Sequence, residues 1–362
     1  MKEKVRDNNL DCLRIIATIF VLILHFDGFF QQATGIAESS EWMIRLTYRL
    51  SESFAYCAIH IFVLISSYYL LKSKFSIRRL IIIWLSTVSI TFIGAIIIWI
   101  LSPNCISIKG MLQSIFPLTT QAYWYVSAYV VLLLISPFLN KLINILTDKE
   151  LLCLTGVLLV GVSIGPTFLQ MFDDYVKLGT NIAVFILLYF IAAVYRRKDI
   201  YFTRIWGMVL YIGCVCVLII SIYLIELLSC KGYIPVGNGW LFFNYQSIFV
   251  ICEAVGLFIF FEKKKNCKSH KVVTVLARNS LFVYMIHMHP IAKNYYVEWN
   301  LFKGANISSP LDYYMLLIGT VFVVYLSGVL IGEIVAKLVN FICNRMEKIT
   351  IYNKVKQFIE IF

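Results

Sequence analysis

Apolar runs of membrane-spanning length dominate the pattern of hydrophobic and polar positions along the 362-residue chain. One helical crossing of a bilayer needs about 20 predominantly apolar residues. The pattern therefore predicts an all-α integral membrane protein with about ten transmembrane helices, separated by short polar or basic segments. The predicted spans are residues 11–30, 52–71, 80–101, 122–140, 151–170, 178–195, 205–225, 241–261, 274–292 and 312–336.

The last residues of the chain are too polar to form an eleventh span. Ile351, Val355, Phe358 and Phe362 are spaced at i, i+4, i+7 and i+11, which places them on one face of a helix with lysines elsewhere. Such a helix is typical of a segment that lies on a membrane surface. We therefore predict a polytopic membrane domain over residues 1–340 and a cytoplasmic amphipathic tail over residues 341–362.

The basic residues predict the orientation in the membrane. If the predicted loops alternate between the two sides, 24 of the 32 Lys and Arg residues fall on the side of the N-terminus, when Arg278 at the start of the ninth span is counted with the loop before it. Seven fall on the opposite side, and Arg14 lies within a span. Cytoplasmic loops of membrane proteins carry such an excess. The prediction is a multi-pass protein of the cell membrane with both termini in the cytoplasm. This topology also explains the net charge of +12 without a nucleic-acid partner, and a composition of 60% hydrophobic and 14% charged residues excludes a soluble domain.

Two ionisable residues, Arg14 and His25, interrupt the first apolar run. Each charged group at the centre of a span costs about 2.5–3.5 kcal/mol on insertion scales, so their presence needs an explanation. A separation of eleven residues corresponds to roughly three helical turns plus 20°, so both side chains leave the helix on the same face, about 16 Å apart. This face is predicted to contact protein or water instead of lipid.

The histidines are the candidate catalytic residues. A neutral imidazole can take a proton from a hydroxyl near pH 7, as the general base in acyl transfer does, and His25 is the candidate for that role. For His60 we expect an interhelical hydrogen bond, and His270 lies in a basic loop. Intramembrane Arg and His residues also line transport pathways, so a transporter or exporter of a small polar molecule or glycan is the alternative function. No cysteine or histidine spacing indicates a metal site.

Four segments, in the expected order, resemble the acyltransferase-3 family of integral-membrane acyltransferases. DCLRIIATIFVLILH matches the Arg-x10-His pattern of that family's first span with Arg14 and His25. The second segment, HIFVLISSYYLLKSKFSIRRL, is similar to its second span and basic loop, although Ser67 stands where the family usually has Gly. The third and fourth, AYWYVSAYVVLLLISPFLNKL and SLFVYMIHMHP, resemble its Trp-aromatic span and its late Tyr-x-x-His segment.

The resemblance implies transfer of an acyl group, usually acetyl, from cytoplasmic acetyl-CoA or another acyl-CoA to a hydroxyl of a cell-envelope polysaccharide or a lipid-linked precursor. His25 would then be the base and Arg14 would orient the donor. Guanidinium groups suit coenzyme A phosphates, so Arg78 and Arg79 are the candidate donor-binding residues, with topology signalling as the alternative. The candidate substrate-binding residues are Ser66, Tyr68, Trp124, Tyr125, Tyr284 and His287.

Trp124 and Tyr125 are equally typical of the aromatic belt at a membrane interface. Three acids lie in or beside apolar segments, and for each of them we expect ion pairing within the bundle and not catalysis: Glu226, Glu253 and Glu333. Some relatives carry an extra extracytoplasmic hydrolase-like domain. The sequence predicts none here, so that the acceptor meets the membrane domain directly or a separate protein completes the transfer.

Overall fold

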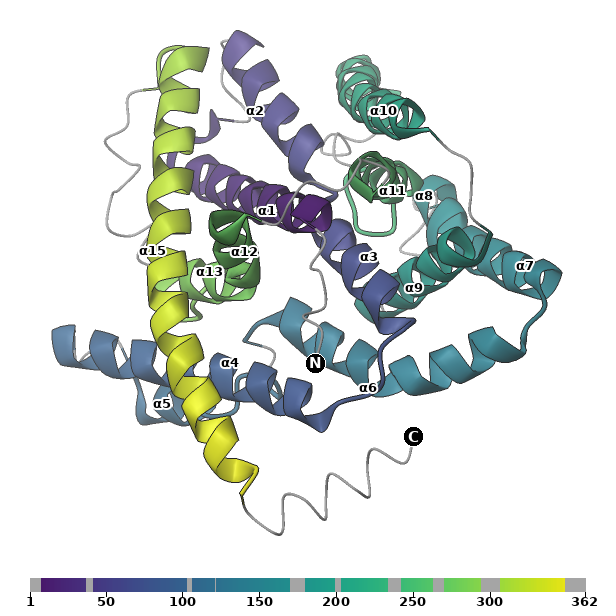
Figure 1. The fold of residues 1–362 in the computed structure, drawn as a ribbon. Coiled ribbons are helices and arrows are strands. Elements are labelled where there is room, and N and C mark those ends of the chain that lie inside the picture. The colour runs from purple at the N-terminus through teal and green to yellow at the C-terminus, as the bar shows by residue number, and fades with distance from the viewer. Residues whose placement is uncertain are drawn as a thin grey trace. The chain divides into compact units, whose positions relative to one another are not determined.

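The computed structural model describes residues 8–36, 42–102, 106–120, 122–169, 180–198, 203–233, 242–262, 270–293 and 307–348 (Figure 1). Every regular element in these ranges is a helix, which confirms the all-α prediction. The helices are α1 (Asn8–Thr34), α2 (Trp42–Ala55), α3 (Ala58–Leu70), α4 (Ile77–Leu101), α5 (Ile108–Gln113), α6 (Trp124–Ile145), α7 (Asp148–Leu159), α8 (Gly165–Leu169), α9 (Thr180–Lys198), α10 (Arg204–Cys230), α11 (Ile248–Glu262), α12 (Lys271–Arg278), α13 (Ser280–His287) and α15 (Pro310–Met346).

Seven helical stretches in the described part are long and apolar enough to cross a membrane. This supports a multi-pass membrane protein, whereas a total of ten crossings stays a prediction. The stretches are Asn8–Gln32, Trp42–Leu70, Ile77–Leu101, Trp124–Ile145, Asp148–Leu169, Arg204–Leu228 and Pro310–Met346.

Three of the predicted spans have a different local structure from a single long helix. The run at 52–71 contains the end of α2 and all of α3, with a turn at Tyr56 and Cys57 between them. The run at 241–261 begins its helix only at Ile248, because the Asn244 side chain accepts the Gln246 backbone N–H at 2.8 Å and holds a turn. The run at 274–292 is divided between α12 and α13 by Asn279, whose side chain donates to Glu333 Oε1 at 2.5 Å. Local polar side chains therefore break helices that hydropathy alone would continue.

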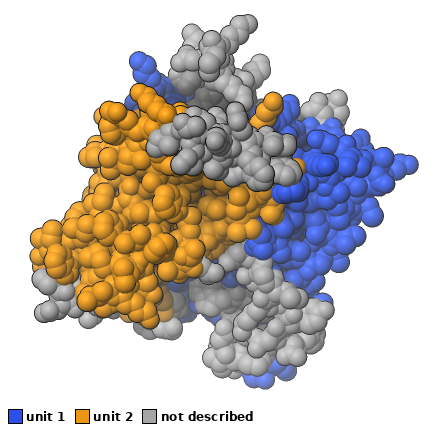
Figure 2. Space-filling model, turned by 90° about the horizontal axis from the view of Figure 1, so that it is seen from below, with its two compact units in different colours: residues 1–24, 45–73, 138–277 blue, residues 25–44, 74–137, 278–362 orange. Residues whose placement is uncertain are grey.

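The chain forms two compact units (Figure 2). Unit 1 comprises residues 1–24, 45–73 and 138–277, and unit 2 comprises residues 25–44, 74–137 and 278–362. In unit 1, α3 packs on α9 and α11, and α10 packs along α11. A Cβ at Gly207 would lie 2.6 Å from the Gly256 carbonyl oxygen, and the reverse holds for Gly256, so α10 and α11 touch backbone to backbone. Small residues allow such approaches between membrane helices.

In unit 2, α13 packs on α4 and on α15, and α15 also packs on α4 (Figure 1). Two glycines spaced four apart, Gly328 and Gly332, bring α15 against α13. A Cβ at Gly328 would lie 2.9 Å from Val283 Cα, and a Cβ at Gly332 would lie 2.8 Å from Phe282 Cβ. The short helix α13 is therefore positioned by direct backbone contact instead of by long side chains.

The beginning of α15 follows from its sequence. Its N-cap Ser309 accepts the Asp312 N–H at 3.2 Å and Pro310 occupies the first turn, a combination that favours helix initiation. The helix runs on to Met346, six residues beyond the predicted limit of the membrane domain. The apolar face predicted for residues 351–362 lies outside the described residues.

Candidate active site

His25 and His287 form the centre of a polar cluster in unit 2. His25 Nδ1 lies 2.7 Å from His287 Nε2, which is hydrogen-bonding distance, and the ring centroids are 5.0 Å apart. His25 is half-buried, whereas His287 is completely buried. The other ring nitrogen of His287, Nδ1, lies 2.7 Å from the Val283 carbonyl oxygen. Both ring nitrogens of His287 are therefore engaged within the protein.

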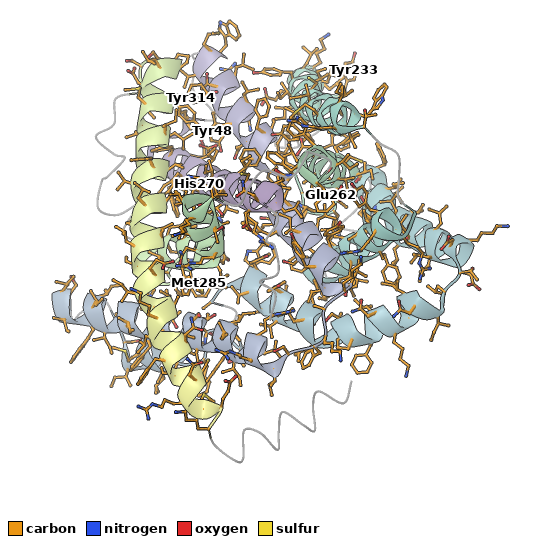
Figure 3. All side chains as sticks on the ribbon, in the orientation of Figure 1. Tyr48, Tyr233, Glu262, His270, Met285 and Tyr314 are labelled. Carbon is orange, nitrogen blue, oxygen red and sulfur yellow. The ribbon has the colours of Figure 1, made fainter. Side chains whose placement is uncertain are left out.

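Tyrosines enclose this pair. Tyr284 lies 6.3 Å from His25 and 6.0 Å from His287 between ring centroids, and it also packs against Tyr123 and Tyr125. The Tyr123 hydroxyl donates to the carbonyl of Met285, which Figure 3 labels on α13, at 2.8 Å. We call His25, His287, Tyr284, Tyr123 and Tyr125 the histidine cluster. It combines a proton acceptor on α1 with aromatic walls on α13, on α6 and on the turn just before α6.

The sequence after α13 explains why that helix stops at His287. Pro290 cannot donate a backbone N–H and disfavours helical conformation in the residue before it, so the chain turns here. His289 stabilises this turn: its Nδ1 accepts the N–H groups of Ile291 and Ala292, and its Nε2 donates to the Thr91 carbonyl at 3.1 Å. Both ring nitrogens of His289 are thus engaged in hydrogen bonds that hold this turn.

A second polar contact in unit 2 was not predicted. Asp27 and Tyr313 are both fully buried, and the Tyr313 hydroxyl donates to Asp27 Oδ1 at 2.5 Å. This bond joins α1 to α15 two residues beyond His25, the member of the histidine cluster on α1. An acid inside the first apolar run is itself a signal, because a buried carboxyl requires a partner. The partner's identity depends on a contact 286 positions away and is not visible in the sequence.

Arg14 lies in unit 1 and has two partners there. Its Nη1 donates to Asp11 Oδ1 at 2.7 Å, one helical turn earlier, and its Cζ lies 5.4 Å from the centre of the Tyr69 ring. Asp11 is fully buried, whereas the Arg14 side chain is 24% exposed. The guanidinium is thus oriented by a charge-assisted hydrogen bond and a cation–π contact while part of it stays accessible.

Tyr68, a predicted substrate-binding residue, belongs to a separate network in unit 1. Its hydroxyl donates to Glu262 Oε1 at 3.2 Å, and the Tyr195 hydroxyl donates to Glu262 Oε2 at 2.5 Å. Arg196 Cζ lies 4.2 Å from the centre of the Tyr68 ring, and Arg196 Nη1 donates to the backbone carbonyl of Tyr68. Ser66 lies half-buried two residues earlier on α3. Glu262 was not anticipated, because it stands at the edge of a basic loop and looks like an ordinary surface acid in the sequence.

The two predicted donor-binding arginines differ in their surroundings. In unit 2, Arg78 donates to Glu347 Oε1 and to Asn344 Oδ1, both at 2.9 Å. Arg79 is half-buried at the start of α4 and forms no ion pair with any residue that the structure describes. Arg79 is therefore the more available of the two for a phosphate group.

The remaining candidates in the sequence are two aromatic residues, His60 and three acids. Tyr125 belongs to the histidine cluster and stacks on Tyr129 at 6.1 Å, whereas Trp124 contacts Tyr125 edge to face at the start of α6. His60 Nε2 donates to the Tyr245 carbonyl at 2.8 Å. His60 therefore has a structural hydrogen bond, but it joins α3 to the turn before α11 and not to another helix as expected.

Two of the three acids form the expected ion pairs. Glu226 Oε1 lies 3.0 Å from Arg49 Nη2, and Glu333 pairs with Arg278. Glu253 instead faces the Cys57 thiol. Among the described residues, no group of His, Cys, Asp and Glu side chains is arranged to hold a metal ion.

Seven apolar helical stretches of spanning length, with a histidine pair inside one compact unit, define an integral membrane protein with an internal polar site. The model of the acyltransferase-3 family, described as an acyltransferase domain, matches residues 7–329. The chain therefore belongs to this family of membrane acyltransferases, and the matched region covers nearly its whole length. No curated protein and no solved structure matches the chain.

Proposed function

We propose that the protein transfers an acyl group, most simply acetyl, from cytoplasmic acyl-CoA to a hydroxyl of a cell-envelope polysaccharide or its lipid-linked precursor. The observation that carries this proposal is the hydrogen-bonded pair of His25 and His287 inside a chain of the acyltransferase-3 family. The proposed setting is the cell membrane, with both termini in the cytoplasm.

In the proposed reaction, the acceptor oxygen attacks the thioester carbonyl and His25 takes the hydroxyl proton. The carbon–sulfur bond then breaks, and the proton on His25 passes to the departing thiolate. The products are an ester and free coenzyme A, and no oxidant or metal is needed. General-base catalysis of this kind contributes about 10²–10⁴-fold in rate.

The arginines supply the proposed donor contacts. Arg14 retains exposed surface while Asp11 fixes its direction, so its fork can bind an oxygen of the donor. Arg79 is the proposed phosphate contact, since the Arg78 guanidinium already has Glu347 and Asn344 as partners. Tyr284 and Tyr125 form the proposed walls of the acceptor site beside His25.

The test compares two histidines. Protein purified in detergent is incubated with acetyl-CoA, with and without glycan acceptor, and free coenzyme A is measured. His25→Ala should lower the rate by about 10²–10⁴-fold while donor binding persists. His270→Ala is the matched control, because His270 is exposed and lies outside the histidine cluster. A well-folded His25→Ala protein that turns over at the parental rate would refute the assignment. Failure of the parental protein to release coenzyme A would favour transport instead.

A further inference from the structure

We infer that His287 is a positioning residue that fixes the tautomer of His25, so that His25 Nε2 is the atom that accepts the proton. The inference rests on the proposed function for its catalytic meaning. The hydrogen-bond geometry that supports it is independent of that function.

The proton positions follow from the Val283 carbonyl. A carbonyl oxygen only accepts hydrogen bonds, so His287 Nδ1, which lies 2.7 Å from it, must carry the proton. His287 is completely buried, and a second proton would make it a cation without solvent, which is costly. The neutral ring therefore has an unprotonated Nε2 that accepts a hydrogen bond.

The same reasoning extends to His25. His287 Nε2 accepts, so the hydrogen in the 2.7 Å contact must come from His25 Nδ1. A neutral His25 with its proton on Nδ1 has its lone pair on Nε2. No described residue hydrogen-bonds to that atom, and His25 is only half-buried. The hydrogen bonds that link the Val283 carbonyl, His287 and His25 thus direct the lone pair of His25 Nε2 toward a substrate.

This arrangement also serves the transition state. When His25 Nε2 takes the hydroxyl proton, the ring becomes a cation whose Nδ1–H already donates to His287 Nε2. The positive charge is then stabilised by a hydrogen bond that needs no rearrangement, the type of preorganised contact that carries much of enzymatic rate enhancement. A hydrogen-bond partner that orients a catalytic histidine and selects its tautomer acts in the same way in other acyl-transfer enzymes.

His289 shows that the inference is specific to His287. It is also buried and lies two residues away, but its Nε2 donates to Thr91 and its Nδ1 accepts from the backbone. Its ring therefore holds the opposite tautomer and has no contact with His25. A substitution at His289 disturbs the same turn without removing the partner of the catalytic ring.

Two substitutions at His287 test whether the residue must accept a hydrogen bond from His25 or only needs to fill the space. In His287→Gln the amide oxygen can reach the position of Nε2 and accept from His25. In His287→Asn the shorter side chain can still donate to the Val283 carbonyl but presents no acceptor to His25. We expect His287→Gln to keep kcat within about tenfold and His287→Asn to lose about 10²–10⁴-fold, with KM for acyl-CoA unchanged in both. His289→Gln should keep kcat per folded molecule.

A second readout does not depend on turnover. Diethyl pyrocarbonate acylates unprotonated imidazole nitrogens, and peptide mass mapping reports its reaction at His25. The modification rate at His25 should be similar in the parental protein and His287→Gln, and lower in His287→Asn. That order would support the tautomer assignment even if no coenzyme A were released, an outcome that would reject only the proposed function. Equal kcat and equal His25 modification in folded His287→Gln and His287→Asn would overturn the inference.

Discussion

The close contact between α15 and α13 makes a small change at Gly328 a sensitive probe of the site. A Cβ there would lie 2.9 Å from Val283 Cα and 3.0 Å from Val283 Cγ2, whereas ordinary contacts begin at 3.4 Å. The first of these atoms is backbone, so Gly328→Ala must move one helix against the other by about half an ångström. Inserting a methyl into such packing costs about 1–3 kcal/mol.

The consequence for activity follows from what Val283 holds. Its carbonyl accepts the bond from His287 Nδ1, so a displaced α13 shifts His287 relative to His25. Because a misplacement of about 1 Å in a catalytic constellation can cost roughly 10²-fold, half that shift should lower kcat by about tenfold. The assay is turnover per folded molecule, together with thermal unfolding in detergent.

Gly319→Ala provides the control on the same helix. Among the residues that the structure describes, no atom lies within 4 Å of a Cβ at Gly319, so the same methyl should fit without displacement. Alanine is also the better helix former, by about 1 kcal/mol. We therefore expect unchanged turnover and equal or higher stability for this variant. Gly328→Ala with parental kcat and parental stability would refute the proposed link between the helix contact and the histidine pair.

Two further predictions concern the donor. Arg79→Ala should weaken acyl-CoA binding by about 10–100-fold, the equivalent of one or two hydrogen bonds to a charged group, and the loss should shrink at high salt. Arg78→Ala should change stability more than affinity, because Arg78 is tied to Glu347 and Asn344, and equal losses of affinity in the two variants would contradict this division. Asp11→Asn keeps the shape but replaces a charge-assisted bond to Arg14 by a weaker neutral one, so KM for acyl-CoA should rise by up to about tenfold at constant folded yield. An unchanged KM would show that Asp11 does not position Arg14 for the donor.

The sequence predicted the helical class because apolar runs of spanning length leave few alternatives. It was less informative where a polar side chain interrupts such a run. Asn279, which bonds to Glu333, stands between α12 and α13, and the turn held by Asn244 precedes α11. Hydropathy averages over these single residues. Their effect depends on local turn chemistry and on a partner 54 positions away in the case of Asn279.

The candidate site shows the same division. His25 and His287 could be selected from the sequence because ionisable residues in apolar spans need a reason. Their hydrogen bond could not, since it joins positions 262 residues apart. Trp124 and Tyr125 were selected from the sequence, but Tyr123 was not. Three adjacent side chains at the start of a helix point in different directions, and the sequence does not show which of them faces the site. In the structure, Tyr123 differs from its two neighbours by its nearly complete burial and by its bond to the Met285 carbonyl.

The separation between His25 and His287 along the chain has a consequence for biosynthesis. The helix with His25 is made first, and its partner follows 262 residues later. Domains of a growing chain form from the N-terminal end onward, and closing a loop of this length costs about 5 kcal/mol in chain entropy beyond a constant. That cost is offset only when α4, α13 and α15 are packed together. A nascent or incompletely assembled bundle therefore holds an imidazole without its orienting partner, and the order of synthesis itself delays the competent site until nearly all the helices are in the membrane.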